Sequence, residues 1–147
     1  MSSKRILAVT LMAGLAFFSI SNANAALVVG LGAKCMDVAG ANTANGTPVN
    51  IFRCNGGFNQ QWSIVNGQIR GIGNKCLDIP GSNTNNGTQL QIFTCNGGAN
   101  QKWRIDNGRV IGLGGKCVDI PGFNTTDGTR LVIFTCNGGT NQRWVVQ

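Results

Sequence analysis

Short runs of alternating polar and apolar residues, separated by turn-forming residues, make up most of this chain. Within Gln89–Cys95, Leu90 and Ile92 face one side, and the residues between them face the other. This period of two is typical of a β-strand with one buried face. Asn-Gly pairs at 66–67 and 107–108 are the dipeptides most favoured in tight hairpins. The pattern predicts an all-β protein.

The middle part of the chain illustrates the expected strands. We predict strands at Gln68–Ile72, Cys76–Ile79, Gln89–Cys95 and Gln101–Asp106, with a polar loop at 80–88. Asn, Gly, Ser, Thr and Pro fill this loop, and these residues accept turn geometry. No stretch after residue 25 has helical periodicity. We therefore expect about twelve short strands, four in each of three similar units.

The same pattern occurs three times with a step of 41 residues. Cys-x-Asp stands at 35–37, 76–78 and 117–119, and each copy ends in Cys-Asn-Gly-Gly-x-Asn-Gln-x-Trp. Residues 71–105 and 112–146 are identical at 23 of 35 positions. The chain is therefore three copies of one unit, at about 27–67, 68–108 and 109–147.

The first 25 residues look like a cleavable secretory signal. Lys4 and Arg5 precede an uncharged, largely apolar run from Ile6 to Ile20, and Ala23-Asn24-Ala25 follows. This order of basic, apolar and small residues is the signal pattern. The run is shorter than the roughly 20 residues of a membrane-spanning helix. We expect a signal at 1–25, one domain at 26–147, no membrane span and a secreted, extracellular protein; an uncleaved anchor is the alternative.

All six cysteines lie after the signal, two in each repeat. An even number of cysteines in a secreted chain indicates disulfides. Six cysteines allow 15 pairings, and the repeat symmetry favours one bond within each copy: Cys35–Cys54, Cys76–Cys95 and Cys117–Cys136. A metal site is not expected, because the chain has no His and the cysteines are widely spaced.

The charge pattern does not indicate a nucleic-acid-binding protein. Without Lys4 and Arg5 the net charge falls from +7 to +5, and Lys34, Lys75 and Lys116 sit at the same place in each repeat. No Lys/Arg-rich stretch occurs, so we expect no nucleic-acid partner.

Catalysis is not expected either. The chain has five Asp, no Glu and no His, and three of the Asp are related by the repeat, which spreads them around the domain. A glycosidase needs two convergent carboxyl groups, and nucleophilic catalysis by Ser or Cys usually needs a neighbouring base. We predict no enzyme activity and no cofactor.

Together, these motifs resemble the ricin B-type lectin domain, and the resemblance covers nearly all of 27–147. Gln-x-Trp alone would be weak, but its threefold recurrence with Cys-x-Asp is specific. The resemblance implies a β-trefoil, with a six-stranded barrel capped by three hairpins and one potential sugar pocket in each lobe.

The resemblance also implies the sugar contacts, residue by residue. The Asp of Cys-x-Asp accepts hydrogen bonds from sugar hydroxyls, an aromatic ring stacks on the sugar, and amides line the pocket. The Gln of Gln-x-Trp is expected to hold the pocket together. The implied residues are Asp37, Asn50, Phe52, Asn59 and Gln60 in the first repeat, Asp78, Gln91, Phe93, Asn100 and Gln101 in the second, and Asp119, Phe134, Asn141 and Gln142 in the third.

The third repeat departs from this pattern, because Val132 replaces the amide found at Asn50 and Gln91. Valine cannot hydrogen-bond a hydroxyl, so we expect sites in the first two repeats and a doubtful third. Structural roles compete with these assignments: the aspartates could cap turns, and the phenylalanines could pack under hairpins. Trp62, Trp103 and Trp144 are expected in the core.

The sequence therefore predicts a lectin that binds galactose-type or xylan-type glycans through up to three sites. Single-sugar pockets bind weakly, and several sites on one rigid body gain by avidity. Two alternatives stay open. The chain could be the cell-binding subunit of a separate toxin or enzyme, or a trefoil scaffold that has lost its sugar sites.

Overall fold

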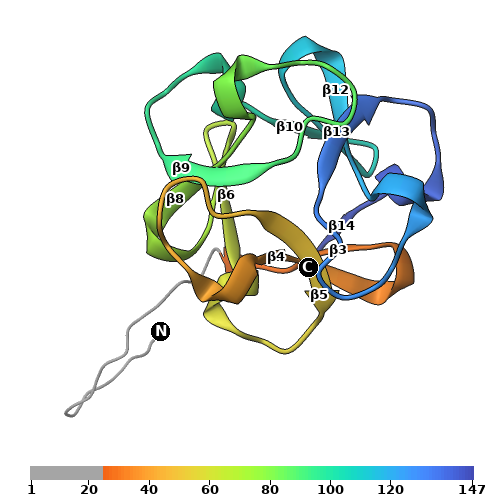
Figure 1. Ribbon diagram of the computed structural model, residues 1–147, viewed down its shortest axis with the longest axis horizontal. Coiled ribbons are helices and arrows are strands. Elements are labelled where there is room, and N and C mark those ends of the chain that lie inside the picture. The colour runs from red at the N-terminus through yellow and green to blue at the C-terminus, as the bar shows by residue number, and fades with distance from the viewer. Residues whose placement is uncertain (1–24) are drawn as a thin grey trace, which may run out of the picture.

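The computed structural model describes residues 25–147. Of the predicted signal segment, only Ala25 falls within this range. Figure 1 shows three similar units arranged around a central axis, each following the last in the colour order of the chain. We call them lobe 1 (27–67), lobe 2 (68–108) and lobe 3 (109–147), after the repeats.

The lobes are built from short strands that form three antiparallel sheets, ordered β14-β3-β4-β5, β2-β6-β7-β8-β9 and β10-β11-β12-β13. Three of the four strands predicted for the middle of the chain are shorter than expected, and the fourth, β8, has the expected length but begins one residue earlier. Their bounds are β2 Ala25–Ala26, β3 Val28–Gly30, β4 Lys34–Val38, β5 Val49–Arg53, β6 Trp62–Val65, β7 Gln68–Arg70, β8 Lys75–Asp78, β9 Gln91–Thr94, β10 Arg104–Asp106, β11 Arg109–Ile111, β12 Lys116–Asp119, β13 Val132–Thr135 and β14 Val145–Val146.

Single turns of 3-10 helix connect these strands. One of them, at Ala99–Gln101, occupies the start of the predicted strand Gln101–Asp106, so that strand begins only at Arg104. The turns are η2 Leu31–Ala33, η3 Ala39–Ala41, η4 Phe58–Gln60, η5 Ile72–Asn74, η6 Pro80–Ser82, η7 Ala99–Gln101, η8 Leu113–Gly115, η9 Pro121–Phe123 and η10 Thr140–Gln142.

The predicted alternation places one side of each strand in a shared core. Leu90 and Ile92 are fully buried, whereas Phe93, on the other face of β9, is 36% exposed. The three tryptophans are at most 5% exposed, and each indole N–H donates to a backbone carbonyl over 3.0–3.1 Å. The prediction that these rings belong to the core is confirmed.

Each tryptophan ring also packs directly against a glycine that lies at the end of a strand or just after it. A Cβ at Gly71 would lie 2.7 Å from Cζ3 of Trp62, and one at Gly112 would lie 2.5 Å from Cζ3 of Trp103. Such contacts are far closer than atoms can approach, so only glycine lets the backbone lie this near the ring.

The three disulfides follow the pairing that the repeat symmetry favours. Cys35–Cys54, Cys76–Cys95 and Cys117–Cys136 each span 19 positions with Cα atoms 5.1 Å apart. Closing a loop of this size contributes roughly 3 kcal/mol in the chain-entropy model. One bond therefore locks each lobe.

Side chains at the turns join each lobe to the next. The Asn45 Oδ1 accepts from the backbone N–H of Thr94, Asn86 accepts likewise from Thr135, and Asp127 from Arg53. These bonds close a ring from lobe 1 through lobe 3 and back. Asn45 and Asn86, which each begin an Asn-Gly-Thr sequence, thus have a structural role.

A second set of contacts runs around the same ring. The ammonium groups of Lys34, Lys75 and Lys116 each donate to the backbone carbonyl of a Thr in the preceding lobe. This explains why a lysine recurs at the same place in every repeat.

Candidate functional site

Strand pairing brings each Asp of the Cys-x-Asp motif opposite the predicted amide position. Asp37 pairs with Asn50, Asp78 with Gln91 and Asp119 with Val132. Residues directly opposite each other in an antiparallel pair share a face of the sheet. The motif spacing therefore assembles one polar site in each lobe.

In lobe 2, three amide groups hold the Asp78 carboxylate. Gln101 Nε2 and Asn100 Nδ2 donate to Oδ2 over 2.8 and 3.2 Å, and Gln91 Nε2 donates to Oδ1 over 3.0 Å. Asp78 is only 3% exposed. Because a carboxylate can accept about four hydrogen bonds, its geometry is fixed while one acceptor position stays open to a ligand hydroxyl.

Lobe 1 repeats this arrangement. Gln60 and Asn59 donate to Asp37 Oδ2 over 2.9 and 3.1 Å. With its amide turned so that both of its polar groups are satisfied, Asn50 donates to Asp37 Oδ1 over 3.0 Å. Arg53 lies over the ring of Phe52, 5.5 Å from its centroid, so a cation covers part of the predicted stacking surface in this lobe.

Lobe 3 keeps the two amides that bind Oδ2 of its aspartate and lacks the amide that binds Oδ1 in the other lobes. Gln142 and Asn141 still donate to Asp119 Oδ2 over 2.8 and 3.3 Å. Val132 is 5% exposed and has no donor, and within residues 25–147 no other group hydrogen-bonds Asp119 Oδ1. Lobe 3 therefore lacks the amide-to-aspartate hydrogen bond of the other two lobes, and the expected loss of a sugar contact stays a prediction.

Phe123 is a second feature that only lobe 3 has, because Ala41 and Ser82 occupy the corresponding places. Its ring is 56% exposed, and its tip lies 3.6 Å from the position of a Cβ at Gly139. Asn141, two residues further on, is 5% exposed, and its Oδ1 is the one buried side-chain oxygen or nitrogen in the described chain without a partner. Sequence comparison of the repeats could have singled out this phenylalanine.

The asparagines before the Gln-x-Trp motif have mainly a supporting role. Both N–H groups of Asn100 are used, one on Asp78 Oδ2 and one on the carbonyl of Ile79, and Asn59 and Asn141 do the same. These side chains hold the aspartate through their N–H groups, and their predicted direct contact with sugar stays a prediction.

The motif glutamines are completely buried in all three lobes. Gln101 donates to Asp78 and to the carbonyl of Thr94, and its Oε1 accepts from the backbone N–H of Asn96. Gln60 and Gln142 make the equivalent bonds. These residues tie the aspartate to the turn after the second cysteine, in the supporting role that the sequence predicts.

The predicted stacking rings are accessible. Phe93 is 36% and Phe134 39% exposed, and Phe52 is partly exposed. Each lies two residues beyond the position opposite the aspartate, on the same face of its strand. Each lobe thus places a partly accessible ring on the strand face that carries the position opposite its buried aspartate.

Burial raises the pKa of Asp37 and Asp119 above the usual value of 3.8, and the hydrogen bonds from Gln60 and Gln142 oppose this rise. The Asp127 carboxylate also raises the pKa of Asp37. Asp127 itself behaves oppositely: its bond to Lys34 lowers its pKa. As the pH falls, Asp37 and Asp119 therefore take up protons before Asp127 does.

Two searches within residues 25–147 gave no candidates. No group of three or more His, Cys, Asp or Glu side chains in this range could hold a metal ion. No helix in the same range has the length and hydrophobicity that crossing a bilayer requires.

Comparisons with known proteins agree with this architecture. The ricin-type beta-trefoil lectin domain family matches residues 65–147, and a family described as ricin-type beta-trefoil lectin domain-like matches residues 13–72. Among curated proteins, the probable lipoprotein EnvE of Salmonella typhimurium is 41% identical over 39 residues, which cover 26% of this chain. The chain spans only 22% of the length of that relative.

Three solved structures are similar over most of this chain. The designed threefold-symmetric protein ThreeFoil is 29% identical (TM-score 0.79), with 84% of this chain and 97% of that one covered. An exo-beta-1,3-galactanase from Clostridium thermocellum is 27% identical (TM-score 0.78; 87% and 31% covered). A non-toxic homologue of type II ribosome-inactivating proteins from Momordica charantia, solved with α-methyl-D-galactoside, is 25% identical (TM-score 0.74; 83% and 46% covered).

The threefold architecture, the disulfide in each lobe and the family match across more than half of the sequence lead to one conclusion. This chain belongs to the ricin-type β-trefoil lectin domain family.

Proposed function

We propose that this protein is a secreted, non-catalytic lectin that binds galactose-type glycans through several sites at once. The observation that carries the proposal is the repeated pairing of a buried, amide-held aspartate with an exposed phenylalanine. Among the similar structures, one is named for action on a galactan and another was solved with a galactoside. Xylan-type glycans are the second ligand class that we would test.

In this mechanism the open acceptor position of the carboxylate accepts a hydrogen bond from one hydroxyl of the sugar ring. Gln101 and Asn100 hold the Asp78 carboxylate in one orientation before the ligand binds, so little conformational entropy is lost on binding. The apolar C–H side of the sugar packs on Phe93. A shallow site of this kind is expected to bind with roughly millimolar affinity, about −4 kcal/mol.

Several sites on one rigid body then strengthen binding to a branched or polymeric glycan. The disulfides and the ring of contacts between lobes fix the sites relative to one another. Binding of a second sugar residue becomes intramolecular once the first is held, which can raise avidity by roughly 10²–10⁴.

Secretion is part of the proposal. The predicted signal at 1–25 supports it, and three intact disulfides are expected in an oxidising compartment. Detection of a mature amino terminus at Ala26 in the culture medium would test it; an intact Met1 on protein held in the cell would contradict it.

The deciding experiment is a glycan array with galactosides, galactans and xylans, followed by competition with free sugar. The double variant Asp37→Asn/Asp78→Asn should lose binding while keeping its fold. Asp106→Asn is the matched control, because this exposed aspartate contacts only Arg109 in the described chain. A folded, oxidised protein that binds no glycan on the array would overturn the proposal.

A second candidate function is delivery of a separate enzyme or toxin to a glycan. It is supported by the galactanase, in which the region similar to this chain makes up only 31% of the molecule. Purification of the protein from its native source would test it: a stoichiometric second polypeptide supports delivery, and a protein that purifies alone contradicts it.

A further inference from the structure

A cleft of about 510 Å³ opens at the base of the β6–β7 hairpin, between lobes 1 and 2, and none of the site aspartates lines it. Phe58 forms one wall and is 78% exposed, the highest value of any large apolar side chain in the described residues. Arg70, Gln61 and Ser63 line the same cleft. An exposed ring beside planar polar groups is the composition that a sugar site needs.

Arg70 is held in place and keeps its charge unneutralised. Its Nε and one terminal nitrogen donate to Gln68 Oε1 over 2.9 and 2.6 Å, and another donates weakly to Asn74. No carboxylate lines the cleft, and none of the three ion pairs within residues 25–147 involves this arginine. The cleft therefore presents an oriented cation without a protein counter-ion.

The equivalent cleft between lobes 2 and 3 is also cationic. It measures about 440 Å³ and is lined by Lys102 and Arg104, again without a carboxylate. The side chain of Lys102 runs along the turn of the first hairpin, since its Cδ lies 3.8 Å from the Cβ position at Gly67. Lys102 and Arg104 form no ion pair among the described residues.

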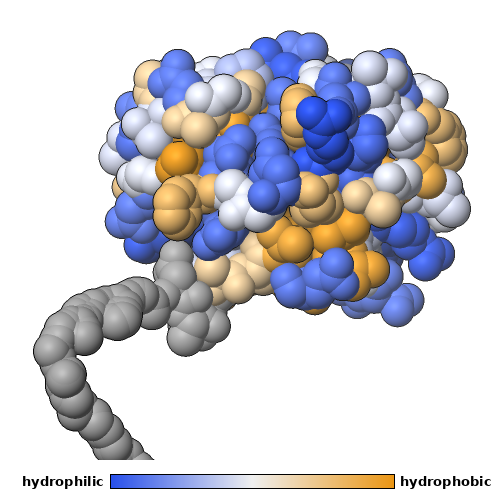
Figure 2. Space-filling model, turned by 90° about the horizontal axis from the view of Figure 1, so that it is seen from below, coloured by the Kyte–Doolittle hydropathy of each residue, from blue (hydrophilic) through white to orange (hydrophobic). Residues whose placement is uncertain are grey.

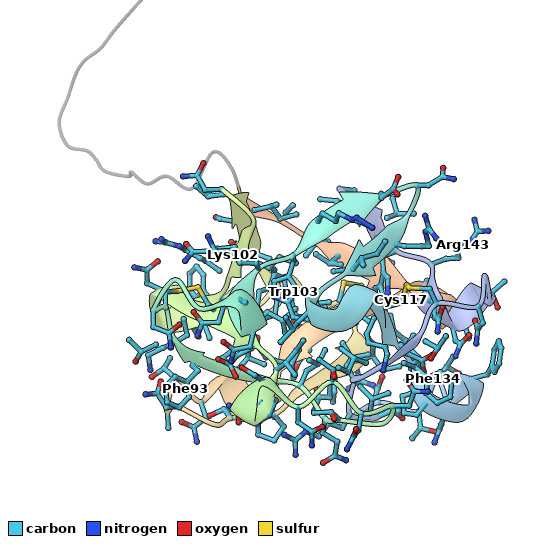
Figure 3. The ribbon with its side chains drawn as sticks, turned by 90° about the horizontal axis from the view of Figure 1, so that it is seen from above. Phe93, Lys102, Trp103, Cys117, Phe134 and Arg143 are labelled. Atoms are coloured by element: carbon cyan, nitrogen blue, oxygen red, sulfur yellow. A yellow bond between two sulfur atoms is a disulfide. The ribbon has the colours of Figure 1, made fainter. Side chains whose placement is uncertain are left out.

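The cleft that Lys102 lines lies on a different side of the molecule from the phenylalanines of the aspartate sites (Figure 3). Figure 3 shows Lys102 and Arg143 on the upper side of the molecule, and Phe93 and Phe134 on the lower side. We call the side of the molecule on which Lys102 and Arg143 lie the hairpin side. It is at the bottom of Figure 2, which shows hydrophilic residues beside a hydrophobic area there. The three site aspartates are at most 4% exposed, so they contribute little negative charge to the surface.

We propose that the hairpin side carries a second carbohydrate site, which binds sugars bearing a carboxylate or sulfate group. Phe58 stacks on the apolar side of the sugar ring, and Arg70 binds the anionic group, for which its planar guanidinium is suited. Lys102 and Arg104 bind the anionic group of a further residue along the same chain. This site does not depend on the aspartate sites.

The chemistry favours a saccharide over other polyanions. A membrane surface or a nucleic-acid backbone would need only the cations, whereas Phe58 adds a ring of the kind that packs against sugar C–H groups. In the repeat, Ala99 stands in place of Phe58 and Ile111 in place of Arg70. The ring and the arginine therefore occur together in one cleft only.

The test compares ligands that differ only in charge. A fluorescent oligogalacturonate is titrated into the purified, disulfide-intact protein, and its carboxyl-reduced form, which has the same backbone without charge, serves as control. A sulfated galactan oligosaccharide and its desulfated form distinguish sulfate from carboxylate. The series is run at low and at physiological salt, because exposed charges are screened by ions.

The repeats supply substitutions that the fold already accommodates. Phe58→Ala and Arg70→Ile introduce the residues of the second cleft, Ala99 and Ile111. Lys102→Gln and Arg104→Ser introduce those of the first cleft, Gln61 and Ser63. We expect Arg70→Ile to weaken oligogalacturonate binding about tenfold or more, the size of one hydrogen bond to a charged group. Phe58→Ala should also weaken it, at every salt concentration. The variant Asp37→Asn/Asp78→Asn should bind the anionic ligand as the unchanged protein does.

Three results would overturn the inference. Loss of oligogalacturonate binding in Asp37→Asn/Asp78→Asn would place the anionic sugar in the aspartate sites. Equal binding of DNA or of phosphatidylserine vesicles, unaffected by Phe58→Ala, would show a general polyanion surface. Binding of neither charged oligosaccharide would exclude the site. A protein that fails on neutral glycans but binds the charged one through Phe58 would leave this inference standing and remove the proposed function.

Discussion

Lobes 2 and 3 share their framework almost residue for residue, yet they surround their aspartates differently. Asp78 is held by three amides, whereas Asp119 is held by two and faces Val132 at the third position. A single branched side chain removes one donor without altering the strand pairing around it. The framework contacts face the core and are constrained by packing, while the amide position is partly exposed in lobes 1 and 2.

The framework half of this comparison predicts the largest effects. Gly71→Ala and Gly112→Ala each place a Cβ within 2.7 Å of a tryptophan ring carbon, so each should lower the free energy of unfolding by about 2–4 kcal/mol. Denaturant unfolding without reductant measures this. Thr140→Ala, at an exposed position where lobe 2 has Ala99, is the control. A large difference between the two glycine variants would show that the lobes are not equivalent in framework.

The aspartates should differ in what their removal costs. Asp78→Ala leaves three amide groups without their acceptor and should lower the unfolding free energy by about 3 kcal/mol. Asp119→Ala leaves two and should cost about 1 kcal/mol less. The same unfolding assay compares them. Equal losses would mean that Gln91 contributes nothing to holding Asp78.

Exchanging the differing residue should exchange the binding strength. Val132→Gln offers Asp119 and the ligand an amide, so we expect galactoside binding in lobe 3 to rise about five- to tenfold, the value of one hydrogen bond. Gln91→Val should weaken lobe 2 by a similar factor. Titration calorimetry with a galactoside measures both. An unchanged affinity in both variants would contradict a role for this position.

Glycan binding through Asp37 and Asp119 should begin to weaken while the pH is still above 3.8, the usual pKa of an Asp side chain. Burial raises the pKa of Asp37 and Asp119, so they become protonated above that value and lose acceptor capacity. The sign for stability is opposite: a raised carboxyl pKa favours the folded state at low pH and costs stability once the group ionises. Binding measured from pH 7 to 3.5, with circular dichroism as control, should therefore fall while the fold persists.

The smallest effect is expected at the junction between lobes 3 and 1. Asp127→Asn copies Asn45 and Asn86, so the bond to the backbone of Arg53 can persist while the ion pair with Lys34 is lost. Because the Lys34 contact lowers the pKa of Asp127, its stabilising effect is present at neutral pH and is lost only below pH 3.8. The variant should differ slightly from the unchanged protein at low salt and hardly at high salt. A salt-independent loss would contradict this.

Much of the fold could be predicted, because the repeat states each constraint three times. The disulfide pairing, the buried face of β9 and the core position of Trp103 all follow from residues that recur at a fixed step. The start of β10 could not be predicted, since the 3-10 turn at Ala99–Gln101 depends on tertiary contacts of the buried glutamine.

The site was predicted less completely. The pairing of Asp78 with Gln91 follows from strand alternation, but the use of both Asn100 N–H groups inside the protein depends on three-dimensional detail. The cationic clefts were missed for a different reason. Arg70, Lys102 and Arg104 are scattered along the sequence, and only the packing of neighbouring hairpins brings them to one side of the molecule.

The most direct test of the central claim is a nuclear magnetic resonance titration with methyl α-D-galactoside. Side-chain amide signals of Gln91, Asn100 and Asn141 report separately on lobes 2 and 3. The account predicts saturable shifts at lobe 2, with a dissociation constant on the order of millimolar, and about five- to tenfold weaker binding at lobe 3. Shifts confined to residues distant from the three aspartates would contradict it.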